Sequence, residues 1–152
     1  METGPLTAPL PGDPPSPASA RRSAPTEPSP VALAFLGDAV WSRCVRLRLL
    51  RQGTARGLHE ASQAYVTCEA QAQAYRRLLP RLTAEEADLC RRAYNSPHLS
   101  KPRHAKGAAY HAATALEALF GWLCYRGDEA RAELLFDLVT DDPLTTDTEK
   151  TI

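Results

Sequence analysis

One segment, residues 108–125, constrains the fold of this chain more than any other. Its sequence, AAYHAATALEALFGWLCY, carries a single formal charge in eighteen residues, that of Glu117. The length approaches that of a membrane span, but His111, Thr114, Glu117 and the many alanines argue against one. Small side chains let neighbouring helices approach closely, which suits a helix at the centre of a bundle. We therefore expect residues 105–126 to form a buried central helix.

The other residues between 30 and 139 have helical periodicity, and no stretch alternates polar and apolar residues as a strand does. Gly53 and Gly127 mark helix ends, and the sequence TAEE at Thr83 to Glu86 is typical of a capping box. The fold class expected is all-α, with helices at about 33–51, 58–65, 68–79, 84–94, 105–126 and 128–139. For the first helix we expect Arg43 and Arg46 to face water, opposite an apolar stripe of Leu33, Leu36, Val40, Cys44 and Leu47.

The two ends of the chain differ from its middle. Nine of the 13 prolines lie in the first 30 residues, so residues 1–29 are expected to be a disordered Pro-rich leader that is unsuited to act as a secretory signal. Residues 140–152 are expected to be an acidic polar tail, which leaves 30–139 as one domain. The formal net charge of zero hides a balance of +4 in residues 31–139, which hold 15 Lys and Arg against 11 Asp and Glu.

The four cysteines show neither the close pairs of a zinc site nor the density of a disulfide scaffold. We expect buried thiols in a reducing cytoplasm; these residues are Cys44, Cys68, Cys90 and Cys124.

Two carboxylates lie in the two most apolar predicted helices without a cation one helical turn away. One is Asp38 in ALAFLGDAVW and the other is Glu117. Burying an ionised carboxylate is costly unless it is paired, and these two helices must pack on each other to bury their apolar faces. The carboxylates can therefore meet. The alternative is that each bonds to distant backbone amides or to arginines such as Arg77 or Arg91.

Two oxygen ligands without a fixed cation suit Mg²⁺, which takes one or two carboxylates and completes its shell with water and substrate phosphate. Such a site favours hydrolysis of a phosphodiester. The basic segment LCRRAYNSPHLSKPRHAK, residues 89–106, holds five cations and no acid. It is either a solvated loop or a surface for phosphate, and the candidate phosphate contacts are Arg91, Arg92, Lys101, Arg103 and Lys106.

The segments LAFLGDAVW and ATALEALFGWL resemble the two signature segments of the ribonuclease III catalytic domain, LEFLGDAV and AFEALIG. Residues 31–139 are most similar to the Mini-ribonuclease III branch, which lacks a double-stranded-RNA-binding domain. The resemblance implies a single all-α domain that forms a homodimer, binds Mg²⁺ and cuts double-stranded RNA, typically precursor 23S ribosomal RNA. It also implies that Asp38 and Glu117 are the catalytic, metal-binding residues. Larger family members add acids where this chain has Ala34 and Thr114, and the Mini branch typically lacks them.

The chain departs from the Mini branch mainly in the basic segment. Asn95 is kept, which adds it to the RNA-binding candidates, but Ala93 and Pro97 replace a glycine and a lysine. His111 stands where arginine is usual and Lys106 where an acid is usual. These changes affect the contacts expected with RNA, and both carboxylates are retained.

The sequence thus predicts a cytoplasmic Mg²⁺-dependent endoribonuclease for double-stranded RNA. An alternative is a non-catalytic RNA-binding or ribosome-assembly module with the same fold, against which the intact carboxylates count. A helical scaffold with a basic face is a third possibility. A metal phosphohydrolase of the HD type is disfavoured because the chain has no His-Asp dipeptide.

Overall fold

The computed structural model describes residues 26–53, 56–99 and 105–141, without the side chains of residues 105 and 106. Within these ranges every regular element is a helix, so the predicted all-α class is confirmed. The predicted leader and tail lie almost entirely outside the described residues. No described helix is long and apolar enough to cross a membrane. The elements are α1 (Pro30–Arg51), α2 (Leu58–Val66), α3 (Cys68–Leu78), the short 3₁₀ helix η2 (Leu79–Arg81), α4 (Ala84–Tyr94), α5 (Ala105–Tyr125) and α6 (Glu129–Thr140).

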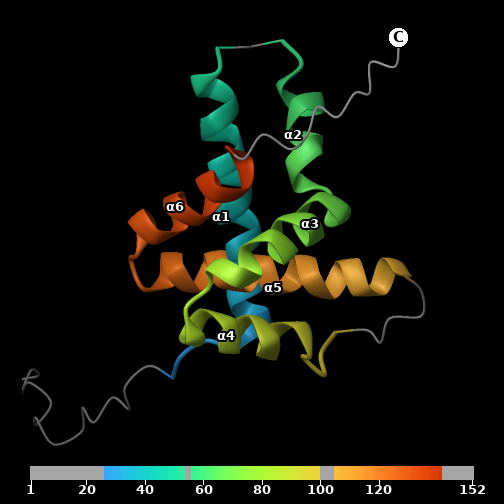
Figure 1. Cartoon of the computed structure of the whole chain (residues 1–152), viewed down its shortest axis with the longest axis vertical. Coiled ribbons are helices and arrows are strands. Elements are labelled where there is room, and N and C mark those ends of the chain that lie inside the picture. Colours follow the sequence, from blue (N-terminus) through green and yellow to red (C-terminus); the bar gives the residue numbers. More distant parts are fainter. Residues whose placement is uncertain (1–25, 54–55, 100–104, 142–152) are drawn as a thin grey trace, which may run out of the picture.

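Helix α5 is the centre of the domain, as the sequence predicts. Helices α1, α3, α4 and α6 all pack against it, and α1 crosses it in Figure 1. From residue 109 to residue 123 every residue is buried except Tyr110 and Glu117. The carboxylate of Glu117 is therefore set into the most buried helix of the domain.

The predicted helix ends are confirmed where a local cap determines them. Thr83 and Glu86 form the capping box that begins α4. Gly53 and Gly127 follow the last turns of α1 and α5 with φ of 81° and 75°, a backbone conformation that favours glycine. Helix α3 ends at Leu78 because Leu79 enters the 3₁₀ turn that contains Pro80.

The buried face of α1 differs from the predicted stripe. Leu36, Val40 and Leu47 are only partly buried, because the ring of Trp41 takes the core position. This ring meets Phe120 and Phe136 edge to face, at centroid distances of 5.0 and 5.1 Å. The residues of α1 that are buried are Leu33, Ala34, Gly37, Trp41, Cys44, Val45 and Leu49. Arg43 and Arg46 are exposed, as predicted.

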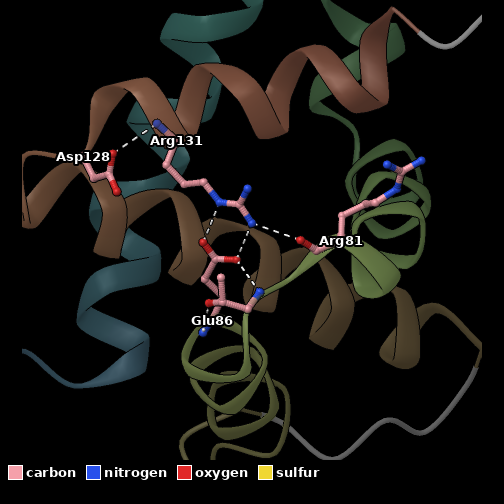
Figure 2. Close-up of polar contacts among 5 residues, drawn as sticks. Arg81, Glu86, Asp128 and Arg131 are labelled. Atoms are coloured by element: carbon pink, nitrogen blue, oxygen red, sulfur yellow. Dashed lines mark hydrogen bonds and ion pairs between the residues drawn. The ribbon is translucent and has the colours of Figure 1, made fainter.

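A buried ion pair joins α6 to the start of α4 (Figure 2). The Arg131 guanidinium donates to both oxygens of the Glu86 carboxylate at 2.8 Å, and it also donates to the Arg81 carbonyl at 3.0 Å. These bonds from Arg131 lower the pKa of Glu86 although burial opposes them. The pair holds α6 against the start of α4 and contributes no group to the candidate site described below.

Candidate active site

Helices α1 and α5 cross with their backbones in direct contact. A Cβ atom added at Gly37 would lie 1.6 Å from the Glu117 carbonyl oxygen, and one at Gly121 would lie 1.8 Å from the Leu33 carbonyl oxygen. Real Cβ atoms never approach so closely, so only glycine fits at these two positions. Asp38 directly follows Gly37, and Glu117 is the residue that Gly37 touches. The crossing therefore places the two acids side by side, as the apolar patterns predict.

The two carboxylates differ in their exposure to water. Glu117 is half-buried, whereas Asp38 is exposed, so the expected cost of burying a carboxylate applies to Glu117 alone. Burial, followed by the negative charge of Asp38, raises the pKa of Glu117 to about 7. The backbone contact of Gly37 with Glu117 is the geometric basis for this influence of Asp38. A cation between the two carboxylates would offset both causes of the raised pKa, the burial of Glu117 and its repulsion by Asp38.

The arginines that could have neutralised the acids have other partners. Arg91 pairs with Asp88 on its own helix, and Arg77 donates to the Val139 carbonyl at 3.0 Å. None of the ion pairs found among the described residues includes Asp38 or Glu117. This leaves two neighbouring oxygen ligands for a metal ion.

The donor set fits a hard divalent cation. The described residues contain no group of three or more His, Cys, Asp and Glu side chains that could hold a metal ion. Mg²⁺ does not need such a group, because one or two carboxylates hold it while water and substrate phosphate fill the other positions. Asp38 and Glu117 are the residues that would hold it.

Helix α3 adds a residue that the sequence did not single out. Gln71 is 4% exposed, and its side chain lies near enough to Glu117 to act to lower the pKa of that carboxyl. The available signal was its place on the buried stripe of α3, one turn before Tyr75 and two before Leu78. A polar residue on such a stripe needs a polar partner.

The cysteine prediction holds for two of the four thiols. Cys44 and Cys90 are buried, but Cys124 is only partly buried and Cys68 is exposed. Cys68 is the first residue of α3, where a side chain can reach solvent. Its pKa is raised by partial burial and then by the charges of Glu69 and Glu117. The thiol thus borders the candidate site.

The predicted RNA contacts that the structure describes bond to neighbouring residues of α4 and not to the two carboxylates. Arg91 and Arg92 lie on the exposed face of α4 and both bind Asp88. The Asn95 side chain donates to the Arg91 carbonyl at 3.0 Å and caps α4. Two further candidates, Lys101 and Arg103, and the side chain of Lys106 lie outside the described residues.

Known proteins are similar to this chain in sequence and in fold. Residues 31–128 match the Ribonuclease III domain family. The chain is 41% identical over 105 residues to the Mini-ribonuclease 3 of Brevibacillus brevis, which covers 68% of this chain and 78% of that protein. It is 39% identical over 114 residues to the Mini-ribonuclease 3 of Symbiobacterium thermophilum, covering 74% and 88%.

The crystal structure of protein FN1578 from Fusobacterium nucleatum has a similar fold. Its TM-score with this chain is 0.66 at 29% sequence identity, and the alignment covers 76% of this chain and 93% of that one. Together with the sequence relatives, this match places the chain in the ribonuclease III family, as an endoribonuclease whose relatives are Mini-ribonuclease 3 enzymes.

Proposed function

We propose that this endoribonuclease cuts double-stranded RNA and requires Mg²⁺, with Asp38 and Glu117 as its metal-binding, catalytic residues. The observation that carries the proposal is the contact between Gly37 and the Glu117 backbone, which brings two carboxylates together without a cationic partner among the described residues. When bound there, Mg²⁺ activates a water molecule and stabilises charge on the phosphoryl group.

The two acids would contribute to metal binding in different ways. Glu117 is half-buried on the central helix, so its side chain has less room to move than that of Asp38. Asp38 is exposed and can face a phosphate that approaches from solvent. The physiological substrate proposed is precursor 23S ribosomal RNA in the cytoplasm, because the relatives are Mini-ribonuclease 3 enzymes and residues 31–139 resemble that branch.

Purified protein tests this function with a long RNA duplex, the separate strands and a DNA duplex of equal sequence. Products are expected from the RNA duplex alone and only with Mg²⁺, and chelation should abolish them. Binding of the duplex without cleavage under all metal conditions would instead identify the non-catalytic RNA-binding module. Cutting of a precursor 23S fragment in preference to an unrelated duplex tests the proposed substrate.

We further propose that the basic segment contacts RNA phosphates through Arg91, Arg92, Asn95, Lys101, Arg103 and Lys106. A triple variant in which Lys101, Arg103 and Lys106 are replaced by glutamine should bind unrelated duplexes more weakly. Each lost phosphate contact should flatten the dependence of log K on log salt by roughly 0.7–0.9. Binding is measured in Ca²⁺, which we expect to support docking without turnover. An unchanged affinity and slope would exclude these three residues, and Arg43 and Arg46 would then be tested.

A homodimer is proposed from the outer face of α1. Phe35 is 86% exposed and Leu50 is 62% exposed, and both lie on the same face of the helix. A groove of about 460 Å³ on this helix is lined by Ala39, Ser42, Arg43, Arg46, Leu47 and Leu50. Large apolar side chains at both ends of one exposed face suit a second copy of the same face, related by a two-fold axis.

Phe35→Asp tests the dimer, because it places a charge where the proposed interface is most apolar. The wild-type protein should have twice the chain mass of 16.6 kDa by light scattering, and the variant should have the chain mass. Leu134→Asp is the matched control, since Leu134 is 50% exposed on α6, outside this face. A monomeric wild type, or a dimer in Phe35→Asp, would contradict the interface.

A further inference from the structure

His111 joins the central helix α5 to the end of α4. Its ring nitrogen Nδ1 lies 2.7 Å from the carbonyl oxygen of Tyr94, the last residue of α4. A carbonyl oxygen can only accept a hydrogen bond, so Nδ1 carries a hydrogen and donates it. His111 is 8% exposed, and its ring meets that of Tyr94 edge to face at a centroid distance of 5.5 Å. A buried polar side chain of α5 is thus bonded to the end of another helix.

This bond satisfies a backbone group that α4 cannot satisfy by itself. The last four carbonyls of an α-helix have no partner within the helix. At the end of α4, the Asn95 side chain donates to the Arg91 carbonyl at 3.0 Å. The Tyr94 carbonyl receives a donor from α5, 17 residues along the chain. His111 therefore provides a second cap for the last turn of α4.

The last turn of α4 carries two of the cations proposed to contact RNA. Arg91 and Arg92 lie there, with side chains 67% and 48% exposed. Both pair with Asp88, but ion pairs on a protein surface are weak, so an RNA phosphate can replace the Asp88 carboxylate. The two guanidinium groups keep their spacing only while this turn stays helical.

The same bond helps to set where this turn lies along α5. His111 and Glu117 are six residues apart on one helix, which is about 9 Å along its axis. Helix α4 also packs against α5 (Figure 1), and the Tyr94 ring stacks on Tyr75 of α3 at a centroid distance of 6.5 Å. The bond from His111 is therefore part of a contact among three helices. This contact holds the last turn of α4 at a fixed distance from Glu117.

We propose that His111 is a positioning residue for RNA binding, which holds the last turn of α4 so that Arg91 and Arg92 meet the duplex in register with Glu117. The proposal rests on the RNA contacts proposed above for these two arginines. It assigns His111 no contact with the substrate and no part in metal binding or proton transfer.

Two substitutions at His111 separate the hydrogen bond from the packing of the ring. His111→Leu fills a similar space without a donor, whereas His111→Asn keeps an N–H donor on a nitrogen bonded to Cγ, as Nδ1 is. The dissociation constant of an RNA duplex in Ca²⁺ should rise about three- to tenfold in His111→Leu, because binding must then re-form a turn that has lost roughly one hydrogen bond. It should stay near the wild-type value in His111→Asn. A role in packing alone predicts the opposite order, since leucine suits apolar neighbours better than asparagine does.

Cleavage kinetics separate positioning from a general loss of structure. In His111→Leu the duplex concentration for half-maximal rate should rise, while the single-turnover rate at saturating duplex and Mg²⁺ stays close to that of the wild type, because Asp38 and Glu117 are unchanged. His59→Leu is the matched control, since His59 is exposed on α2, and it should change neither quantity. An unchanged affinity in His111→Leu, or a lower saturating rate without a change in affinity, would overturn the proposal.

Hydrogen exchange tests the turn itself without RNA. The Asn95 and Ser96 N–H groups donate to carbonyls in the last turn of α4, at 3.1 and 3.2 Å. Both amides should exchange faster in His111→Leu, and the Asp128 N–H, which is bonded at the end of α5, should not change. Unchanged exchange of both α4 amides would contradict the role of His111.

A measurement on the wild-type protein does not depend on how any variant folds. At pH 8, where an ordinary imidazole is neutral, the ring nitrogen chemical shifts of His111 should place its proton on Nδ1. A proton on Nε2 would leave the Tyr94 carbonyl without this donor and would overturn the proposal.

The outcomes separate this inference from the function on which it rests. If the double variant Arg91→Gln with Arg92→Gln binds duplex RNA more weakly while His111→Leu does not, only the role of His111 fails. If the double variant binds RNA as the wild type does, the proposed contacts on α4 fail, and the role of His111 in RNA binding fails with them. Where both roles hold, His111→Leu should weaken binding less in the double variant than in the wild type.

Discussion

Asp38→Asn and Glu117→Gln are each expected to lower the rate of RNA cleavage by about 10³-fold or more while the fold is retained. Each substitution keeps the shape of the side chain and removes a charged metal ligand, and a loss of this size corresponds to roughly 4 kcal/mol of transition-state stabilisation. Single-turnover cleavage of an RNA duplex at saturating Mg²⁺ measures the effect. Circular dichroism on the same samples checks that the helices remain.

The metal-free stability of Glu117→Gln provides a second readout. Because the pKa of Glu117 is raised from 4.5 to about 7 in the folded protein, ionising this carboxyl destabilises the fold, and stability is lost as the pH rises through this interval. Glutamine does not ionise. The variant should therefore melt at a higher temperature than the wild type at pH 8, and the difference should shrink as the pH falls toward 4.5. A variant that unfolds, but whose folded fraction cuts RNA normally, would show that Glu117 is structural.

Gly37→Ala is expected to destabilise the domain by about 4 kcal/mol or more, the range of severe overpacking. The added Cβ would lie 1.6 Å from a backbone oxygen of α5. A backbone oxygen cannot move aside by a change of rotamer, as a side chain can. Alanine is the better helix former by about 1 kcal/mol, so helix propensity predicts the opposite sign. Urea unfolding measures the free energy of unfolding. Any folded fraction should cut poorly, since the two helices must part and the carboxylates move with them.

The control for this substitution is Ala87→Gly, the reverse exchange at an exposed position within α4. It should cost only the difference in helix propensity, about 1 kcal/mol. If the two variants cost the same, the crossing of α1 and α5 does not limit the fold.

The sequence predicted the structural features that depend on nearby residues or on the apolar pattern of a helix. The cap at Thr83 needs only Glu86 three residues later, and Gly127 needs only the end of its own helix, so both were correctly placed. The meeting of Asp38 and Glu117 was also predictable, because two apolar helices rich in small residues must pack together. The resemblance of both signature segments to the ribonuclease III family was confirmed by the comparisons.

The sequence did not predict features that depend on how the helices cross. Asp38 is exposed because it lies at the edge of the contact between α1 and α5, and no pattern within α1 gives that edge. Trp41 rather than Val40 takes the core position for the same reason, since Phe120 and Phe136 approach from other helices. Gln71 was missed because Glu117, whose pKa it acts to lower, is 46 residues away in the sequence. The RNA contacts are still predictions.

The direct contact of two helix backbones has a consequence for how this enzyme can evolve. Asp38 and Glu117 both project from helix interiors, so their separation is set by a rigid crossing and little conformational entropy is lost when an ion binds. The basic segment, residues 89–106, begins in the second half of α4 and reaches the first residues of α5. Substitutions there can alter which duplex is accepted while the distance between the acids stays constant. Under the roles proposed for these residues, substrate preference and hydrolytic chemistry belong to separate parts of one small domain.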